Sequence, residues 1–273
     1  MNIFQIDDQQ ELRQDGQKWI LFKNNVPQPV GPHELYKYYA LEDYNLEALE
    51  QGYLYFNNPQ DFNDPFDCNY NLIKEQQRIA KDWETLFAPN DVGNKGITCF
   101  SENGMQPLMW GHYAKAYCGF VVKYSTNLKF ESLNGINKAK LLRVIYSTNP
   151  KPINQDMPFA NQYQLSVKLS GWCYEQEWRL VIDKLDLSVD KLYFKKQIVQ
   201  EIYLGYQLYV GRNSKRLQDK RKKLERILKE IYPNVRKQIV TPHESRLELI
   251  KRPLVNIDSD ELLEAYLKGK LTL

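Results

Sequence analysis

The sequence predicts an α+β protein with mixed or largely antiparallel sheets and flanking helices. The chain has 273 residues, of which 42% are hydrophobic, enough to bury a core of ordinary size. Short runs rich in aromatic and β-branched residues outnumber the helical patterns. These runs are not spaced as regular βαβ units, which argues against a doubly wound parallel sheet.

We expect a polar N-terminal extension over residues 1–34, a single α+β domain over residues 35–250 and a C-terminal tail or helix over residues 251–273. Residues 19–22 of the extension suggest an edge strand. Aromatic and β-branched composition predicts strands at residues 35–39, 53–56, 97–101, 119–122, 141–146, 177–182, 201–204, 235–240 and 247–250.

Helix signals lie between these strands. Asp43 is suited to cap a short helix that Gly52 ends, and Pro107 is suited to the first turn of another. A helix is expected before Gly171. The charged residues 71–95 suggest a helix followed by a loop.

A basic helix is predicted over residues 213–231. Its apolar residues form one stripe, which favours a helix docked on the protein with a solvated basic face. The second interpretation is a nucleic-acid contact. Single-strand binding requires aromatic residues among the charges, and this segment has none. The net charge of the whole chain is only +3, so a polyanionic partner must be argued from this segment alone.

The composition favours a cytoplasmic protein that does not enter a membrane. The N-terminus lacks the basic start and apolar run of a secretory signal, and no stretch approaches the roughly 20 apolar residues of a membrane span. The four cysteines are too scattered for a CxxC metal site and too few for a disulfide scaffold. With three histidines besides, we expect free thiols and no metal.

Three polar and aromatic clusters are difficult to explain by packing alone. Residues 63–67 (Asn-Asp-Pro-Phe-Asp) follow the Tyr-Lys-Tyr of residues 36–38. Residues 99–102 (Cys-Phe-Ser-Glu) precede Met-Trp-Gly-His-Tyr at 109–113, and residues 174–179 read Tyr-Glu-Gln-Glu-Trp-Arg. Over residues 35–250, the order of these motifs resembles a prokaryotic family called domain of unknown function 2971. Resemblance to that family implies no particular reaction.

The layout more distantly resembles the ADP-ribosyltransferase superfamily, in which a basic residue on an early strand, a serine-bearing strand and a late Glu-x-Glu line a cleft for NAD. The resemblance implies that Tyr36 or Lys37 meets the ribose and phosphates and that Ser101 lies on the second strand. It makes Glu175 and Glu177 the catalytic pair, while His112 and Arg179 complete the expected NAD-binding set. The family pattern prefers Arg or His on the first strand, and a lysine lacks the planar fork that grips phosphate.

The spacing of the acidic pair agrees with this chemistry. In an extended segment, Glu175, Glu177 and Arg179 emerge on one face, because the strand period is two. A carboxylate at Glu177 would stabilise the oxocarbenium-like ribose formed when nicotinamide leaves, and Glu175 would orient or deprotonate the acceptor. The alternative is that Arg179 pairs with a carboxylate on an exposed strand, contributing under about 1 kcal/mol.

Other polar residues favour structural roles. His112 is interpreted as a hydrogen-bonded, half-buried side chain, with proton transfer as its second role. Asp64 and Asp67 favour turn formation beside Pro65 and are only secondarily cleft residues. The density of polar and aromatic residues leads us to expect that the three clusters meet in one pocket.

Two functional hypotheses follow. In the first, the protein is an NAD-dependent ADP-ribosyl transferase or NAD glycohydrolase that acts on a macromolecular acceptor as an intracellular toxin or anti-phage effector. In the second, it is a non-catalytic module that binds a nucleotide or peptide, with the basic helix as a contact face. Nucleotide turnover distinguishes them. Nuclease chemistry is less favoured, because the sequence has no recognisable constellation of metal-binding carboxylates.

Overall fold

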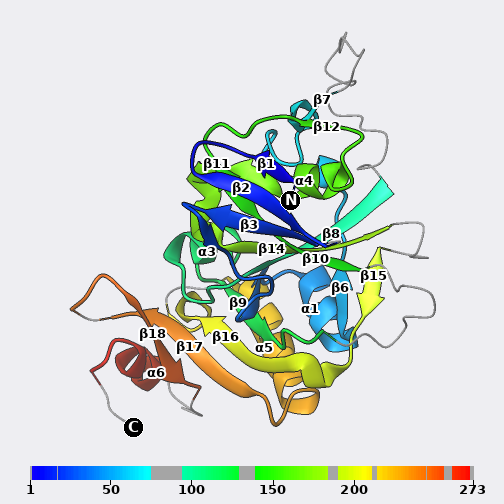
Figure 1. The fold of residues 1–273 in the computed structure, drawn as a ribbon. Helices are drawn as coiled ribbons and strands as arrows, with labels where there is room; N and C mark the ends of the chain where they lie inside the picture. The colour runs from blue at the N-terminus through cyan, green and yellow to red at the C-terminus, as the bar shows by residue number, and fades with distance from the viewer. Residues whose placement is uncertain are drawn as a thin grey trace. The chain divides into compact units, whose positions relative to one another are not determined.

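The structure is a computed structural model. It describes residues 2–16, 18–74, 94–128, 139–183, 190–210, 214–243, 245–254 and 260–270. The chain forms two compact units: unit 1 comprises residues 1–32, 55–99 and 133–191, and unit 2 comprises residues 33–54, 100–132 and 192–273. Figure 1 shows the elements of each unit.

Unit 1 begins with an antiparallel sheet of four strands in the order β1-β2-β3-β4. The strands are β1 (Ile3–Gln5), β2 (Gln10–Asp15), β3 (Lys18–Lys23) and β4 (Val26–Pro27). Ile6 and Leu12 are buried together with Phe159 and Tyr163, while Trp19 packs against this cluster. The N-terminal segment that we expected to be an extension therefore contributes to the core of unit 1.

The rest of unit 1 combines short strands with one helix. β10 (Lys140–Arg143) pairs antiparallel with β14 (Glu177–Asp183), and β8 (Lys95–Ser101) follows β14 in the sheet order. β11 (Ile145–Ser147) pairs in parallel with β13 (Val167–Leu169), and β12 (Ile153–Asn154) does so with β7 (Ile73–Lys74). α4 (Ala160–Ser166) and the 3-10 helix η4 (Ser170–Glu175) flank β13.

The strand predicted over residues 141–146 is wrong in one respect, because the chain changes partner there. β10 pairs with β14, whereas β11 pairs with β13. Val144 separates them and donates its backbone N–H to the carbonyl of Glu177 at 3.0 Å. The strand-like composition of residues 141–146 gave no signal of this exchange.

Unit 2 contains the strand order β5-β9-β16-β17-β18. The strands are β5 (Leu35–Ala40), β9 (Gly119–Tyr124), β16 (Val199–Gly205), β17 (Arg236–Pro242) and β18 (Leu249–Pro253). Neighbours are antiparallel except β16 and β17, which are parallel. The prediction of an α+β fold with mainly antiparallel sheets is confirmed.

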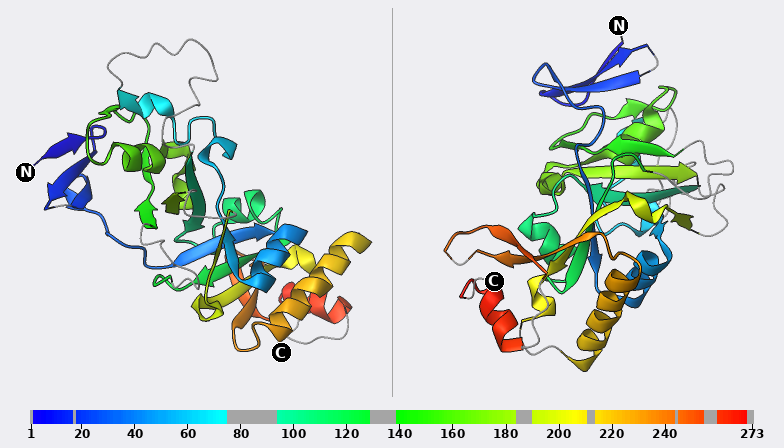
Figure 2. Two further views of the ribbon diagram at one scale, coloured as in Figure 1. Left: turned by 90° about the vertical axis from the view of Figure 1, so that its right-hand side faces the viewer. Right: turned by 90° about the horizontal axis from the view of Figure 1, so that it is seen from below.

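Helices α1 (Asp43–Gln51) and α5 (Lys215–Glu230) lie side by side in unit 2 (Figures 1 and 2). α6 (Asp260–Leu267) lies near β18, where Tyr266 donates its hydroxyl to the carbonyl of Pro253 at 3.2 Å. The short α3 (Pro107–His112) precedes β9. Strands β6 (Tyr53–Tyr55), β8 and β15 (Lys191–Tyr193) each begin in one unit and end in the other.

The helix ends follow the sequence signals with one exception. Gly52 ends α1 at φ 80°, a left-handed conformation that glycine adopts without steric cost, and its N–H bonds the carbonyl of Ala48. The expected cap at Asp43 is wrong: Glu42 occupies the cap position without a side-chain cap bond, and Asp43 is the first helical residue. In α5, the side chain of Ser214 accepts from the N–H of Leu217, as an N-cap should.

Most of the helix and loop expected over residues 71–95 lies outside the described residues. Among the helices that the structure does describe, none combines the length and apolar character that crossing a bilayer requires.

Candidate functional site

Strand β14 places Glu177 and Arg179 on one face in unit 1, because they are two residues apart. Arg179 is 0% exposed, and its Nε donates to Glu177 Oε1 at 2.8 Å while Nη2 donates to Oε2 at 3.1 Å. The alternative of an ion pair on an exposed strand is therefore wrong. A planar guanidinium that grips one carboxylate through two bonds is the strong form of this contact.

Glu175 reaches the same place by a different route. It ends the 3-10 helix η4, and Gln176 follows in the left-handed region at φ 46°. The expectation of one extended segment over residues 175–179 is thus wrong, because this turn breaks the strand period. Glu175 is nevertheless buried close to Glu177.

The loop at residues 63–68 brings the other carboxylate. Asp64 Oδ1 accepts from the N–H of Phe66 at 2.9 Å, the side-chain turn expected from the sequence. Arg179 then binds Asp67 through two bonds, Nη1 to Oδ1 at 2.8 Å and Nη2 to Oδ2 at 2.7 Å. Nη1 also donates to the carbonyl of Leu165 at 2.9 Å. Asp67 is therefore more than a turn residue, since its carboxylate accepts two hydrogen bonds from the Arg179 guanidinium.

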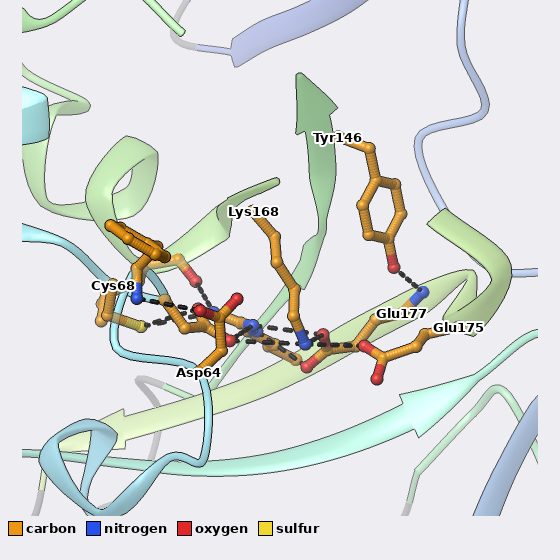
Figure 3. Close-up of polar contacts among 10 residues, drawn as sticks. Asp64, Cys68, Tyr146, Lys168, Glu175 and Glu177 are labelled. Atoms are coloured by element: carbon orange, nitrogen blue, oxygen red, sulfur yellow. Dashed lines mark hydrogen bonds and ion pairs between the residues drawn. The ribbon is translucent and has the colours of Figure 1, made fainter. Parts of the chain in front are cut away.

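Lys168 of β13 lies between three carboxylates (Figure 3). Its Nζ is 2.7 Å from Glu175 Oε2, 3.3 Å from Glu177 Oε2 and 3.5 Å from Asp67 Oδ2. The same atom lies 4.9 Å from the centre of the Trp172 ring, a cation–π contact. We call Asp67, Lys168, Glu175, Glu177 and Arg179 the charge cluster.

Opposite charges within the charge cluster hold Glu177 and Lys168 ionised. Burial alone would raise the pKa of Glu177, but Arg179 and Lys168 lower it to about 2. Burial would lower the pKa of Lys168, but the attraction of Glu177, Asp67 and Glu175 raises it well above its ordinary value. Neither group exchanges a proton near neutral pH, so Glu177 and Lys168 supply fixed charges rather than an acid or a base.

The backbone around Glu177 is also fixed. Tyr146 accepts from the backbone N–H of Glu177 through its hydroxyl at 2.9 Å, as Figure 3 shows. The carbonyl of Tyr146 in turn accepts from Gln10 Nε2 at 2.8 Å. In the described part of the chain, Asp64 Oδ2 is buried without a hydrogen-bond partner. The charge cluster thus holds three carboxylates and two cations away from solvent, an arrangement that occurs at functional sites.

A cavity of about 330 Å³ lies in the same unit, and Lys168 belongs to its lining. Its volume is at the lower end of the range for small-ligand sites. The lining combines side-chain amides with apolar and proline side chains: Phe66, Asn69, Asn71, Leu72, Asn149, Pro150, Pro152, Val167, Lys168 and Leu169. Such a wall can hold a flat, polar, uncharged group.

Unit 2 holds the remaining residues of the expected NAD site. Tyr36 of β5 lies directly opposite Ser101 of β8. Its hydroxyl donates to Glu34 at 2.5 Å, and burial followed by Glu34 raises the pKa of Tyr36 to about 12. Lys37 points to the other face of β5, where its Nζ is 5.6 Å from the Tyr39 ring centre. Tyr36 and Lys37 therefore cannot line the same wall.

His112 is exposed at the end of α3, so the half-buried interpretation is wrong. The helix turns Met109 and Trp110 inward, and His112 falls on the outer side. Trp110 is fully buried and donates its Nε1–H to the carbonyl of Gly104 at 3.0 Å.

The structure therefore joins Glu175, Glu177 and Arg179 within unit 1, and Tyr36 and Ser101 within unit 2. One pocket shared by all the predicted residues stays a prediction. The sequence reasoning missed Lys168. Its signal was a single cation between Val167 and Leu169 in an otherwise apolar strand.

Within the described ranges, no group of three or more His, Cys, Asp or Glu side chains is arranged to hold a metal ion. In the charge cluster, Lys168 and Arg179 already occupy the space between the carboxylates.

Comparison with known proteins supports the resemblance to domain of unknown function 2971 over part of the chain. Residues 109–180 match the model of a family described as "Protein of unknown function (DUF2971)". The similarity is confined to this segment. The matched segment begins within α3 and ends within β14, so it includes Lys168, Glu175, Glu177 and Arg179 of the charge cluster. Searches of curated proteins and of solved structures found no match.

Proposed function

We propose that the protein binds a nucleotide by enclosing its base and sugar in the cavity beside the charge cluster. The observation that carries the proposal is the lining itself, in which Asn71, Asn149 and the ring of Phe66 accompany Lys168. Side-chain amides both donate and accept hydrogen bonds, as the edge of a base and the hydroxyls of a ribose require. Phe66 is 58% exposed, so its ring is available for stacking.

The charges indicate which part of the nucleotide enters. Lys168 is already bound by Asp67, Glu175 and Glu177, so its ammonium group is not available to a phosphate. Phosphates are therefore disfavoured within the cavity and would extend into solvent. The nicotinamide ring of NAD is cationic and carries an amide, so NAD is the ligand that we test first.

The experiment is isothermal titration of the full chain with NAD. The wild-type protein should bind, and Asn71→Ala with Asn149→Ala should weaken binding about 30-fold, since two net hydrogen bonds contribute about 2 kcal/mol. Asn71 and Asn149 are exposed, so their truncation should leave the fold intact. Asn127→Ala removes an exposed amide in unit 2 and serves as the matched control. No binding by the wild type, or equal binding by the double variant, would overturn the proposal.

The second candidate is that bound NAD is cleaved, as in an ADP-ribosyl transferase or NAD glycohydrolase acting as a toxin or anti-phage effector. The observation that favours it is the ionised state of Glu177, whose pKa is held near 2. The nicotinamide ring of NAD is cationic and departs as a neutral molecule when its bond to the ribose breaks. Its departure therefore needs no proton from the protein. It needs a negative charge that stabilises the cationic ribose left behind. Glu175, bound to Lys168, would then act on the acceptor side.

Nicotinamide release distinguishes the two candidates. Purified protein is incubated with NAD, with and without a cell extract as acceptor, and free nicotinamide is measured by chromatography. The enzyme candidate predicts release that slows in the Asn71→Ala, Asn149→Ala variant, and NAD depletion when the wild type is expressed in cells. If the protein binds NAD but releases no nicotinamide under all of these conditions, the enzyme candidate is refuted and the binding candidate stands.

A further inference from the structure

Six of the basic residues of α5 in unit 2 fall into two groups with different surroundings. The helix carries eight basic and three acidic residues between Lys215 and Glu230, although the whole chain has a net charge of only +3. The rest of the chain is therefore slightly acidic. A positive surplus concentrated on one helix is a local feature that needs its own explanation.

One group anchors the helix. Lys220 is buried and pairs with Glu42, and its Nζ lies 3.6 Å from Asp43 Oδ2. Arg221 donates to the carbonyl of Leu208 at 3.2 Å. Arg226 pairs with Glu50 of α1 at 3.0 Å. Leu224, Ile227 and Leu228 are buried on the same helix, which confirms the apolar docking stripe.

The second group does not anchor the helix to any residue that the structure describes. Lys215, Lys222 and Lys229 are exposed and make no ion pair within the described ranges. They recur every seven residues, so they form one line along the side of α5 that faces away from the buried stripe. Asp219 and Glu230 are the exposed acidic residues of this helix. We call the three lysines the lysine row.

Acidic residues of α5 offset the lysine row only in part. Asp219 lies within four residues of Lys215 and Lys222, and Glu225 lies within four residues of Lys222 and Lys229. Glu225 is also paired with Arg221, at 3.7 Å. Two carboxylates therefore accompany three lysines, and the row keeps a local positive surplus that a polyanion can neutralise.

We propose that the lysine row binds the phosphate backbone of double-stranded nucleic acid. Over 14 residues, an α-helix advances about 21 Å, a length over which one strand of a duplex presents about six phosphates. Single strands are disfavoured because the exposed face of α5 has no aromatic side chain on which bases could stack. An anionic membrane is disfavoured because the apolar residues Leu224, Ile227 and Leu228 are buried and cannot insert.

The test measures the binding of a fluorescent 20-base-pair duplex, as DNA and as RNA, by anisotropy between about 50 and 200 mM salt. Each lysine contact should contribute about 0.9 to the slope of log K against log salt, so the row should account for a slope near −2.7 and about a 40-fold loss of affinity over this range. Lys215→Gln, Lys222→Gln, Lys229→Gln should reduce the slope by about 2.7. Binding of both duplexes identifies a backbone contact, and binding of one identifies the helical form that is recognised.

The matched control removes the same charge elsewhere. Lys18, Lys23 and Lys151 are exposed residues of unit 1, and Lys18→Gln, Lys23→Gln, Lys151→Gln should leave the slope unchanged. Equal losses in the two triple variants would overturn the proposal, because they would show an effect of net charge alone. It is also overturned if neither duplex binds, or if vesicles of 70% phosphatidylcholine and 30% phosphatidylserine bind the wild type while the duplexes do not. Circular dichroism spectra that coincide with that of the wild type establish that both variants are folded.

Discussion

Replacement of Lys168 by methionine should destabilise unit 1 severely at neutral pH. Methionine retains most of the length of the lysine stem and removes the ammonium group, with its charge and its N–H donors. Lys168 Nζ lies within 3.5 Å of oxygens from Glu175, Glu177 and Asp67, and all four residues are buried. The variant therefore leaves Arg179 as the single cation beside three carboxylates.

The magnitude follows from this burial. Loss of one partner from a buried ion pair costs about 3–5 kcal/mol, because the remaining charge can be neither solvated nor paired. Lys95 of the same unit provides the comparison: its Nζ is 3.0 Å from Asp183 Oδ2, but the aspartate side chain is 34% exposed. Lys95→Met should cost under about 1 kcal/mol, as for a partly solvated pair.

Urea unfolding followed by circular dichroism measures both variants against the wild type. At pH 7 we expect the free energy of unfolding to fall by about 3–5 kcal/mol for Lys168→Met. The deficit should narrow as the pH is lowered, since an unpaired carboxylate takes up a proton and relieves the repulsion. A loss no larger than that of Lys95→Met would refute the reasoning, because it would show that water reaches the charge cluster.

Four further substitutions test other parts of the structure. Arg179→Lys keeps the charge but not the fork that binds Asp67 and Glu177, and should cost at least about 3 kcal/mol in urea unfolding. Gly104→Ala should lower the free energy of unfolding by about 1–3 kcal/mol, because the new Cβ would lie 2.6 Å from a ring carbon of Tyr36 and overpacking is destabilising. In its control, Gly111→Ala, the new Cβ meets no atom within 4 Å. That substitution should stabilise α3 by up to about 1 kcal/mol. The pKa of Glu177 is lowered from 4.5 to about 2, so its contribution is fully present above pH 4.5 and is lost as the pH falls toward 2. Glu177→Ala should therefore unfold less steeply than the wild type in an acid titration, and an unchanged profile would contradict the assigned pKa.

The strands could be predicted wherever a run of aromatic and β-branched residues keeps one partner. β5 and β14 follow their predicted ranges to within a residue. The exchange of partners at Val144 could not be predicted, because it depends on where β13 lies in space. The left-handed turn at Gln176 was equally hidden, since glutamine carries no preference for that conformation.

The candidate site was predictable in part. The Glu-x-Glu-x-Arg spacing identified Glu177 and Arg179, because residues two apart on a strand share a face. Their burial could not be inferred, since it depends on Asp67 from a distant part of the sequence and on Lys168 of another strand. A lysine flanked by Val167 and Leu169 was the available signal, and a buried cation implies partners of opposite charge.

The most direct test of the central claim is a crystal structure of the protein with NAD at a concentration that saturates binding. We predict electron density for the nicotinamide and its ribose between Phe66 and Asn149, with Lys168 still bound to Glu175. Density for NAD in unit 2 alone, or a cavity that stays empty at saturation, would contradict the assignment of this cavity as the nucleotide site.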